Sequence, residues 1–132
     1  MTKQEMFDRA WRGLKVQGFA RAVRMTTVEE RTLPNGRLEP EAEICCYLDS
    51  NGNRCAWGHV DPEGTATNPA MTVTDLRVHR IGIAASLTDD GVEFARELQR
   101  AHDAPYSAIG VERDMRQVAE KHGLTIPDEV AP

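Results

Sequence analysis

The chain has 132 residues, of which 40% are hydrophobic and 28% are charged, and its formal net charge is -5 at neutral pH. This length and composition suit one folded domain with its own core and exclude wholesale disorder. The negative charge disfavours general adhesion to nucleic acid or to an anionic membrane. No apolar run approaches the roughly 20 residues that a membrane span needs, so we expect a single domain over residues 1–132 with no membrane contact.

The first predicted element is a helix close to the N-terminus. Thr2 and Glu5 have the spacing of a capping box, which starts the helix at about Lys3. Apolar residues then recur at helical spacing, and Gly18 ends the helix after Gln17. The residues on the predicted buried side are Met6, Phe7, Ala10, Trp11 and Leu14.

A first hairpin is predicted after this helix. Strands over residues 21–33 and 37–48 would flank the turn Leu33-Pro34-Asn35-Gly36, in which Pro and Gly occupy favourable turn positions. Pro40 weakens the second strand and favours an edge or a loop there.

A second hairpin is predicted around Asn51-Gly52, a pair that favours a type I′ turn. In a regular register Cys46 pairs with Trp57, and Leu48 pairs with Cys55. Alternation along the strands then places these four apolar side chains on one face. The two hairpins together predict a small antiparallel β-meander.

The next stretch gives weaker signals. Asp61-Pro62-Glu63-Gly64 is expected to break the strand, and residues Thr65 to Pro69 are expected to form a loop. The apolar residues between 70 and 87 fit neither strand nor helix periodicity, so this segment receives no assignment.

Two helices are predicted in the C-terminal part. Thr88 is an N-cap for a helix from about Asp89 to His102, which Pro105 stops. A second helix runs from about Val111 to His122 and ends at Gly123, and the tail from Asp128 to Pro132 is expected to fray. The predicted fold class is therefore α+β, with the C-terminal helices packed on one face of the meander.

The chain starts without the apolar core of a signal peptide, and it contains three cysteines, an odd number. Both features predict a cytoplasmic protein with reduced thiols. Cys45 and Cys46 are adjacent and make a poor disulfide pair, and Cys46 with Cys55 would lie near the limit of bridging geometry.

A zinc site is one chemical alternative. Cys46, Cys55 and His59 could be three ligands, with His79 or His102 as the fourth. The two cysteines are widely spaced and no second cysteine pair follows, whereas structural zinc sites usually have paired ligands two to four residues apart. We therefore expect no metal and no other cofactor.

A cysteine nucleophile is the other enzymatic alternative. Cys45 or Cys55 could be activated by His102, with Asp103 as the group that orients the histidine. Neighbouring side chains on a helix diverge by about 100°, so His102 and Asp103 are not expected to orient each other. Helix-terminal histidines are also favoured by the helix dipole alone.

A core position is the preferred interpretation of Cys55. A buried cysteine behaves as a small hydrophobe. On that interpretation Cys55→Ser is expected to cost more stability than Cys55→Ala, because the added hydroxyl needs a partner.

Phosphate and nucleic-acid motifs are missing from the sequence. No Gly-x-x-x-x-Gly-Lys and no Gly-x-Gly-x-x-Gly occurs. The arginines around the first hairpin have no interleaved aromatic residues and favour a solvated β-face rather than sequence-specific nucleic-acid binding. They are Arg21, Arg24, Arg31 and Arg37.

The centre of the chain contains the motif Cys45-x-Tyr47 followed by Gly52-x-x-Cys55-Ala56-x-Gly58. This motif resembles the centre of a family of small uncharacterised phage and prophage proteins. Flanking matches are Phe7-Asp8, Gln17-Gly18, Leu98-Gln99-x-x-His102-Asp103 and Val118 to Leu124. The chain departs from the family in an insert over about 24–43 and in His59-Val60-Asp61-Pro62. The resemblance implies a phage-related cytoplasmic protein, located in the host cytoplasm, with no agreed activity.

The leading functional hypothesis is a non-enzymatic accessory protein that binds a host protein or ribonucleoprotein complex, such as an inhibitor of a CRISPR defence system. The alternative is a small cysteine- or zinc-dependent enzyme. Within the insert, exposed polar residues are the expected partner contacts, because loops on a rigid scaffold often carry function. These residues are Glu29, Glu30, Asn35, Arg37, Glu39, Glu41 and Glu43.

Overall fold

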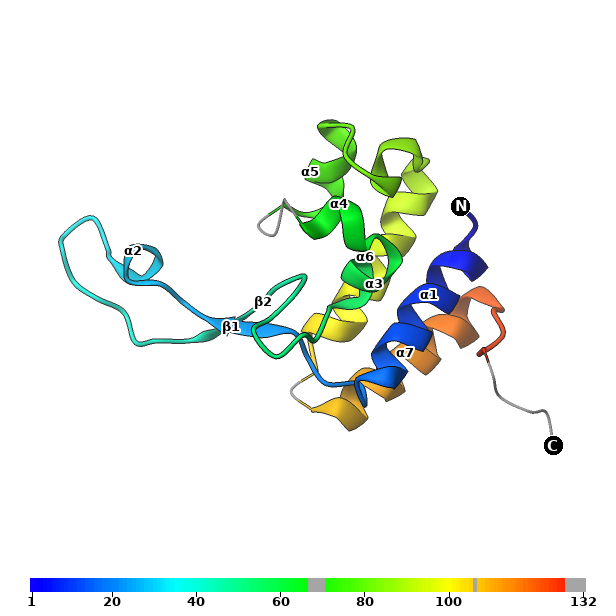
Figure 1. Cartoon of the computed structure of the whole chain (residues 1–132), viewed down its shortest axis with the longest axis horizontal. Helices are drawn as coiled ribbons and strands as arrows, with labels where there is room; N and C mark the ends of the chain where they lie inside the picture. Colours follow the sequence, from blue (N-terminus) through cyan, green and yellow to red (C-terminus); the bar gives the residue numbers. More distant parts are fainter. Residues whose placement is uncertain (67–70, 106, 128–132) are drawn as a thin grey trace.

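Helices dominate the computed structural model, which describes residues 1–66, 71–105 and 107–127 (Figure 1). No helix in these ranges is both long and apolar enough to cross a membrane. The predicted tail from Asp128 and part of the loop predicted up to Pro69 lie outside the described residues. The helices are α1 (Lys3–Val16), α2 (Val28–Arg31), α3 (Ala56–Val60), α4 (Pro62–Ala66), α5 (Val73–Val78), α6 (Asp89–Asp103) and α7 (Ala108–His122), with a 3₁₀ turn η1 (Ile83–Ser86) and the strands β1 (Val23–Met25) and β2 (Glu43–Cys45).

Helix α1 confirms the sequence prediction. The Thr2 hydroxyl accepts a hydrogen bond from the Glu5 amide at 3.1 Å, and the Glu5 carboxylate accepts one from the Thr2 amide at 3.2 Å. The helix ends at Val16, two residues before Gly18, which has a φ of +66°. All five apolar residues predicted for its inner side are buried.

Helix α6 is the central element of the body, because it packs against α1, α3, α5 and α7. It begins at Asp89 after the Thr88 cap, as predicted, and ends one residue later than predicted. Helix α7 begins at Ala108, three residues before the predicted start, because the Ser107 hydroxyl accepts a hydrogen bond from the Gly110 amide and caps the helix there. One connected core includes residues from Met6 in α1 to Ala119 in α7.

The first hairpin becomes a long arm, which we define as residues 24–43. Its strands pair antiparallel, with Arg24 opposite Ile44, but each has three residues because the Thr27 cap starts α2 inside the predicted first strand. The predicted turn is present, with the Leu33 amide bonded to the Arg37 carbonyl at 2.8 Å. Figure 1 shows the arm extending away from all helices other than its own α2.

The predicted second hairpin is wrong in its register and in its second strand. Leu48 bridges Arg54 instead of Cys55, and the chain enters α3 directly after Cys55, so Cys46 and Trp57 are not strand partners. The turn also lacks the type I′ geometry, because the φ of Asn51 is not positive. The Asp49 carboxylate instead accepts hydrogen bonds from two amides of the turn, those of residues 51 and 53, each at 2.9 Å.

The expectation of helices packed on one face of a β-meander is not confirmed. Within the described residues the sheet has two strands, and none of their six residues is fully buried, so the sheet is not the surface on which the C-terminal helices build the core. The predicted loop from Thr65 to Pro69 is wrong for its first two residues, because Thr65 and Ala66 belong to α4. This helix begins at Pro62, a position where the missing N–H of proline is tolerated. The unassigned segment forms α5 and η1.

Asp61 holds α4 and η1 together. Its side chain is buried, and its two carboxylate oxygens accept hydrogen bonds from the Gly64 amide at 3.0 Å and the Ile83 amide at 2.9 Å. A Cβ atom at Gly64 or at Gly82 would lie 2.2 Å or 2.1 Å from Asp61 Oδ2, and Gly82 also has a φ of +60°. Only glycine at both positions allows the backbone to approach the carboxylate this closely.

Asp61→Ala is expected to destabilise the protein by about 2–4 kcal/mol, because one buried and one partly buried amide lose their acceptor. Urea unfolding followed by circular dichroism measures this difference. Glu63→Ala, an exposed change in the same turn, is the matched control and should alter stability by less than about 0.5 kcal/mol. Equal stabilities of the two variants would contradict the structural role assigned to Asp61.

Candidate functional site

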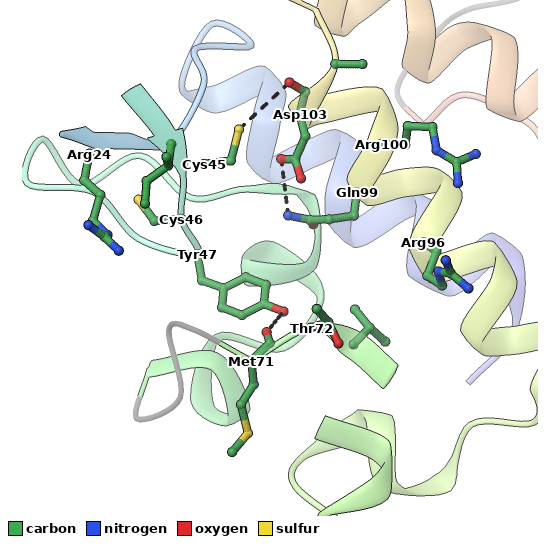
Figure 2. Close-up of a pocket in the computed structure, with 13 residues that line it drawn as sticks. Arg24, Cys45, Cys46, Tyr47, Met71, Thr72, Arg96, Gln99, Arg100 and Asp103 are labelled. Carbon is green, nitrogen blue, oxygen red and sulfur yellow. Dashed lines mark hydrogen bonds between the residues drawn. The ribbon is translucent and has the colours of Figure 1, made fainter. Parts of the chain in front are cut away.

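A cavity of about 690 Å³ lies between the base of the arm and the helical body (Figure 2). This volume falls in the range of about 300–1,000 Å³ that small-molecule sites occupy. Three chain segments line it: the sheet and the residues after it, the start of α5, and one side of α6. The lining residues are Arg24, Ile44, Cys45, Cys46, Tyr47, Met71, Thr72, Val73, Arg96, Gln99, Arg100, Asp103 and Ala104.

Hydrogen bonds between these segments hold the cavity walls in place. The Tyr47 hydroxyl donates to the Met71 carbonyl and so links the segment after β2 to the start of α5. Thr72 caps α5 by accepting from the Asp75 amide at 3.1 Å. On the opposite wall Gln99 accepts from the Trp57 amide at 3.0 Å, which fixes α6 against α3.

Cys45, His102 and Asp103 form a compact cluster beside the cavity. One possible ligand atom from each residue lies within 4.8 Å of the other two. Within residues 1–66, 71–105 and 107–127, this is the one group of three such residues that lies so close together. His102 is completely buried, whereas Cys45 and Asp103 are half-buried. This cluster is the arrangement that the sequence suggested for a cysteine nucleophile, with Cys45 rather than Cys55 as its thiol.

The hydrogen bonds of His102 determine its tautomer. Its Nε2 accepts from the Ala22 amide at 3.0 Å, so this nitrogen carries no proton. Its Nδ1 therefore carries the proton and donates to Asp103 Oδ1 at 2.7 Å. Both ring nitrogens are used, and neither remains free to accept a proton from Cys45.

The prediction that His102 and Asp103 cannot orient each other is wrong. Asp103 is the last residue of α6, and its side chain folds back to Nδ1 of its neighbour. Gln99, one turn earlier, also donates to Asp103 Oδ1, at 3.4 Å. Asp103 thus fixes the histidine ring, but in the orientation that presents Nε2 to the backbone of residue 22.

The Cys45 thiol is not activated. Burial raises its pKa above the ordinary value, with the nearby Asp103 carboxylate adding to the effect. The Arg21 guanidinium donates to Cys45 Sγ at 3.2 Å and opposes the shift without overcoming it. Burial likewise raises the pKa of Cys46. A nucleophile needs a lowered thiol pKa or an adjacent base, and this cluster supplies neither.

The same cluster does not suit a divalent cation. Binding at Nδ1 of His102 would require the proton to move to Nε2, where it would face the Ala22 N–H. The Arg21 guanidinium against Cys45 Sγ adds a positive charge next to any bound metal. The cluster is therefore a structural link between the arm and α6. Arg21, which the sequence pattern places on a solvated β-face, instead donates a hydrogen bond to Cys45 in this cluster.

The weaker zinc candidate is also not assembled. Among the described residues, the ligand atoms of Cys46, Cys55 and His59 do not come within 4.8 Å of one another. The His59 Nε2 lies 2.8 Å from Gln17 Oε1, at the end of α1. The same Gln17 side chain bonds to the backbone amide and carbonyl of Arg54, at 3.0 and 2.7 Å.

Cys55 is fully buried, which agrees with its predicted core position. It is also the N-cap of α3, because its Sγ accepts from the Gly58 amide at 3.3 Å. Burial raises the pKa of this thiol to about 12. A serine hydroxyl at this position would find a donor in the Gly58 amide, so the structure favours the opposite order of stabilities for Cys55→Ser and Cys55→Ala.

The predicted contact residues of the arm are all exposed, but three of them are engaged locally. Glu30 pairs with Arg24 at 2.6 Å and caps α2, Glu41 lies 3.8 Å from Arg31, and Asn35 accepts from the amide two residues on. Within the described part of the chain, the other four side chains have no hydrogen-bond or ion-pair partner. These are Glu29, Arg37, Glu39 and Glu43.

Comparison of the chain with known protein families, with curated protein sequences and with solved structures found no match in any of the three.

Cys55→Ser is expected to destabilise the protein less than Cys55→Ala. Serine keeps an acceptor for the Gly58 amide and is a favoured N-cap, whereas alanine removes the cap at a cost of about 1 kcal/mol and leaves a small cavity. Thermal and urea unfolding of the two variants measure the order. A serine variant less stable than the alanine variant would contradict the capping role.

The stability of the protein is expected to fall between pH 6.5 and about pH 4 in part because of His59. Burial lowers the pKa of His59 from 6.5 to about 4, so in this window the unfolded chain binds a proton that the folded chain does not. Stability therefore rises with pH across the window. The ring is only partly buried, so the effect is on the order of 1 kcal/mol after solvent screening.

His59→Gln should reduce this pH dependence, since glutamine does not titrate. The measurement is the difference in free energy of unfolding between pH 7 and pH 5, for the variant and the unmodified chain. If this difference is the same for the variant and for the unmodified chain, His59 is protonated in the folded protein at pH 5, contrary to the lowered pKa.

Proposed function

We propose that the chain is a non-catalytic binding protein whose arm contacts a macromolecular partner. The observation that carries this proposal is that residues 24–43 contain no buried residue. A segment of this length that contributes nothing to the core has little role in the stability of the body. Its length and its projection from the helices suit contact with another molecule (Figure 1).

The arm surface combines apolar and acidic side chains. Met25, Val28 and Leu38 are large hydrophobic residues with 49%, 54% and 57% of their surface exposed. The unpaired carboxylates of Glu29, Glu39 and Glu43 lie on the same arm. Apolar anchors with a charged surround are typical of protein–protein interfaces, and the free carboxylates favour a partner with basic side chains over a nucleic acid.

We propose further that the partner is a host protein or ribonucleoprotein complex, with a CRISPR effector as the specific candidate. Support for this narrower proposal comes from the resemblance of the central motif to small phage proteins. The geometry of Cys45 and His102 does not favour the enzymatic alternative, because the thiol pKa is raised and both histidine nitrogens are engaged.

Replacing the arm tip, Leu33 to Leu38, with a short Gly-containing turn is expected to leave folding intact and to abolish partner binding. The double substitution Val28→Asp with Leu38→Asp should weaken binding by roughly thirtyfold or more, since loss of two apolar anchors costs about 1–2 kcal/mol each. The measurements are binding to a panel of guide-loaded CRISPR effectors and inhibition of their DNA cleavage.

The matched control is Val78→Asp with Ile109→Asp, which makes the same chemical change at exposed apolar positions outside the arm. This variant should bind as the unmodified chain does. Equal loss in both double variants would reject the arm as the contact site. No inhibition of any effector by the unmodified chain would reject the narrower proposal of a CRISPR inhibitor.

A further inference from the structure

The cavity beside the arm has a local charge opposite to that of the whole chain. Its charged lining residues are three arginines and one aspartate, which leave a formal charge of +2 in a chain of net charge -5. Arg24 and Arg96 are each paired with a glutamate outside the lining, so within the described residues the charge of Arg100 is the part that no paired carboxylate offsets. Because a concave site concentrates the field of the charges around it, the Arg100 edge of the cavity favours an anion although the chain as a whole is negative.

The arginines lie at the edges of the cavity. Figure 2 shows Arg24 at one edge beyond Cys46, and Arg96 with Arg100 at the opposite edge along α6. Arg24 pairs with Glu30 and Arg96 with Glu93, and neither glutamate lines the cavity. Within the described ranges the Arg100 guanidinium has no hydrogen-bond or ion-pair partner, so it is available to a ligand.

The space between these edges is largely apolar. The Tyr47 ring forms one wall together with Ile44 and Val73, and the hydroxyl of Tyr47 is already bonded to the Met71 carbonyl. An aromatic ring can therefore lie against this wall without leaving a buried polar group unpaired. Sites of this kind, an apolar wall with a cationic edge, match ligands that have a ring at one end and an anionic group at the other.

We infer that this cavity is a binding site for a small amphipathic anion, namely an aromatic group that carries a phosphate, sulfonate or carboxylate. The ring lies against Tyr47 and Val73, and the anionic group lies at the Arg96 and Arg100 edge. None of the predicted contact residues of the arm lines this cavity, and the inference does not depend on the identity of the arm's partner.

Two cysteines make the site accessible to measurement. Cys45 and Cys46 line the cavity, whereas Cys55 is fully buried and serves as an unreactive internal reference. A ligand that fills the cavity should slow the alkylation of its lining thiols by iodoacetamide, Cys45 first because it is the more exposed of the two. Mass spectrometry of peptides identifies which of the three thiols has reacted.

The direct test uses 8-anilinonaphthalene-1-sulfonate, an aromatic sulfonate whose fluorescence rises in apolar surroundings. We expect one saturable site per chain. The double variant Arg96→Gln with Arg100→Gln should weaken binding by roughly five- to tenfold, as loss of two partly exposed charge contacts predicts. The matched control, Arg77→Gln with Arg113→Gln, removes the same charge outside the cavity and should bind as the unmodified chain does.

Competition distinguishes the two halves of the site. Phenyl phosphate should displace the fluorescent anion at lower concentration than inorganic phosphate, because the apolar wall binds the ring. Equal displacement by the two competitors would overturn the inference that the ligand is an amphipathic anion.

Two other results would overturn the location of the site in this cavity. They are equal affinities of the two double variants for the fluorescent anion, and no protection of Cys45 from alkylation at saturation. The arm variant Val28→Asp with Leu38→Asp should bind the fluorescent anion as the unmodified chain does. Loss of binding in this variant would show that the anion binds to the exposed apolar residues of the arm.

Discussion

The hydrogen bond from the Ala22 amide to His102 Nε2 connects the two parts of this molecule. Ala22 directly precedes β1, and His102 lies near the end of the central helix α6, so this single contact fixes where the arm leaves the body. The bond requires a neutral histidine with its proton on Nδ1, and the Asp103 carboxylate enforces that tautomer. Gln99 extends the same network to the amide of Trp57. One side of one helix thus aligns the arm, α3 and the cavity wall, and the polar residues that resemble a catalytic set have a positioning role.

The sequence predicted those elements whose limits are encoded within a few residues. Thr2 with Glu5 and Thr88 with its acidic first turn define the starts of α1 and α6 through side-chain to backbone bonds that span three residues. The first turn of the arm was predicted on the same local basis. Ser107 was overlooked as a cap, and for this reason the predicted start of α7 was late.

Errors in the secondary structure arise where one local pattern overrides another. Asn51-Gly52 carries a hairpin signal, but Asp49 bonds two amides of the turn, and Cys55 acts as a helix cap instead of a strand residue. The cavity was not predictable, because its walls come from segments separated by about twenty to eighty residues and no periodicity encodes their meeting. The cysteine and histidine of the cluster were named from the sequence, but the tautomer that removes their reactivity depends on the amide of Ala22, about eighty residues away from the histidine.

The close packing of Gly64 and Gly82 around Asp61 limits how this protein can diverge. The Asp61 carboxylate leaves no room for a side chain at position 64. A relative without an acid at position 61 can therefore have alanine at position 64. Position 82 keeps its requirement for glycine through its backbone conformation, whatever residue stands at 61. Relatives should therefore change positions 61 and 64 together while position 82 remains glycine.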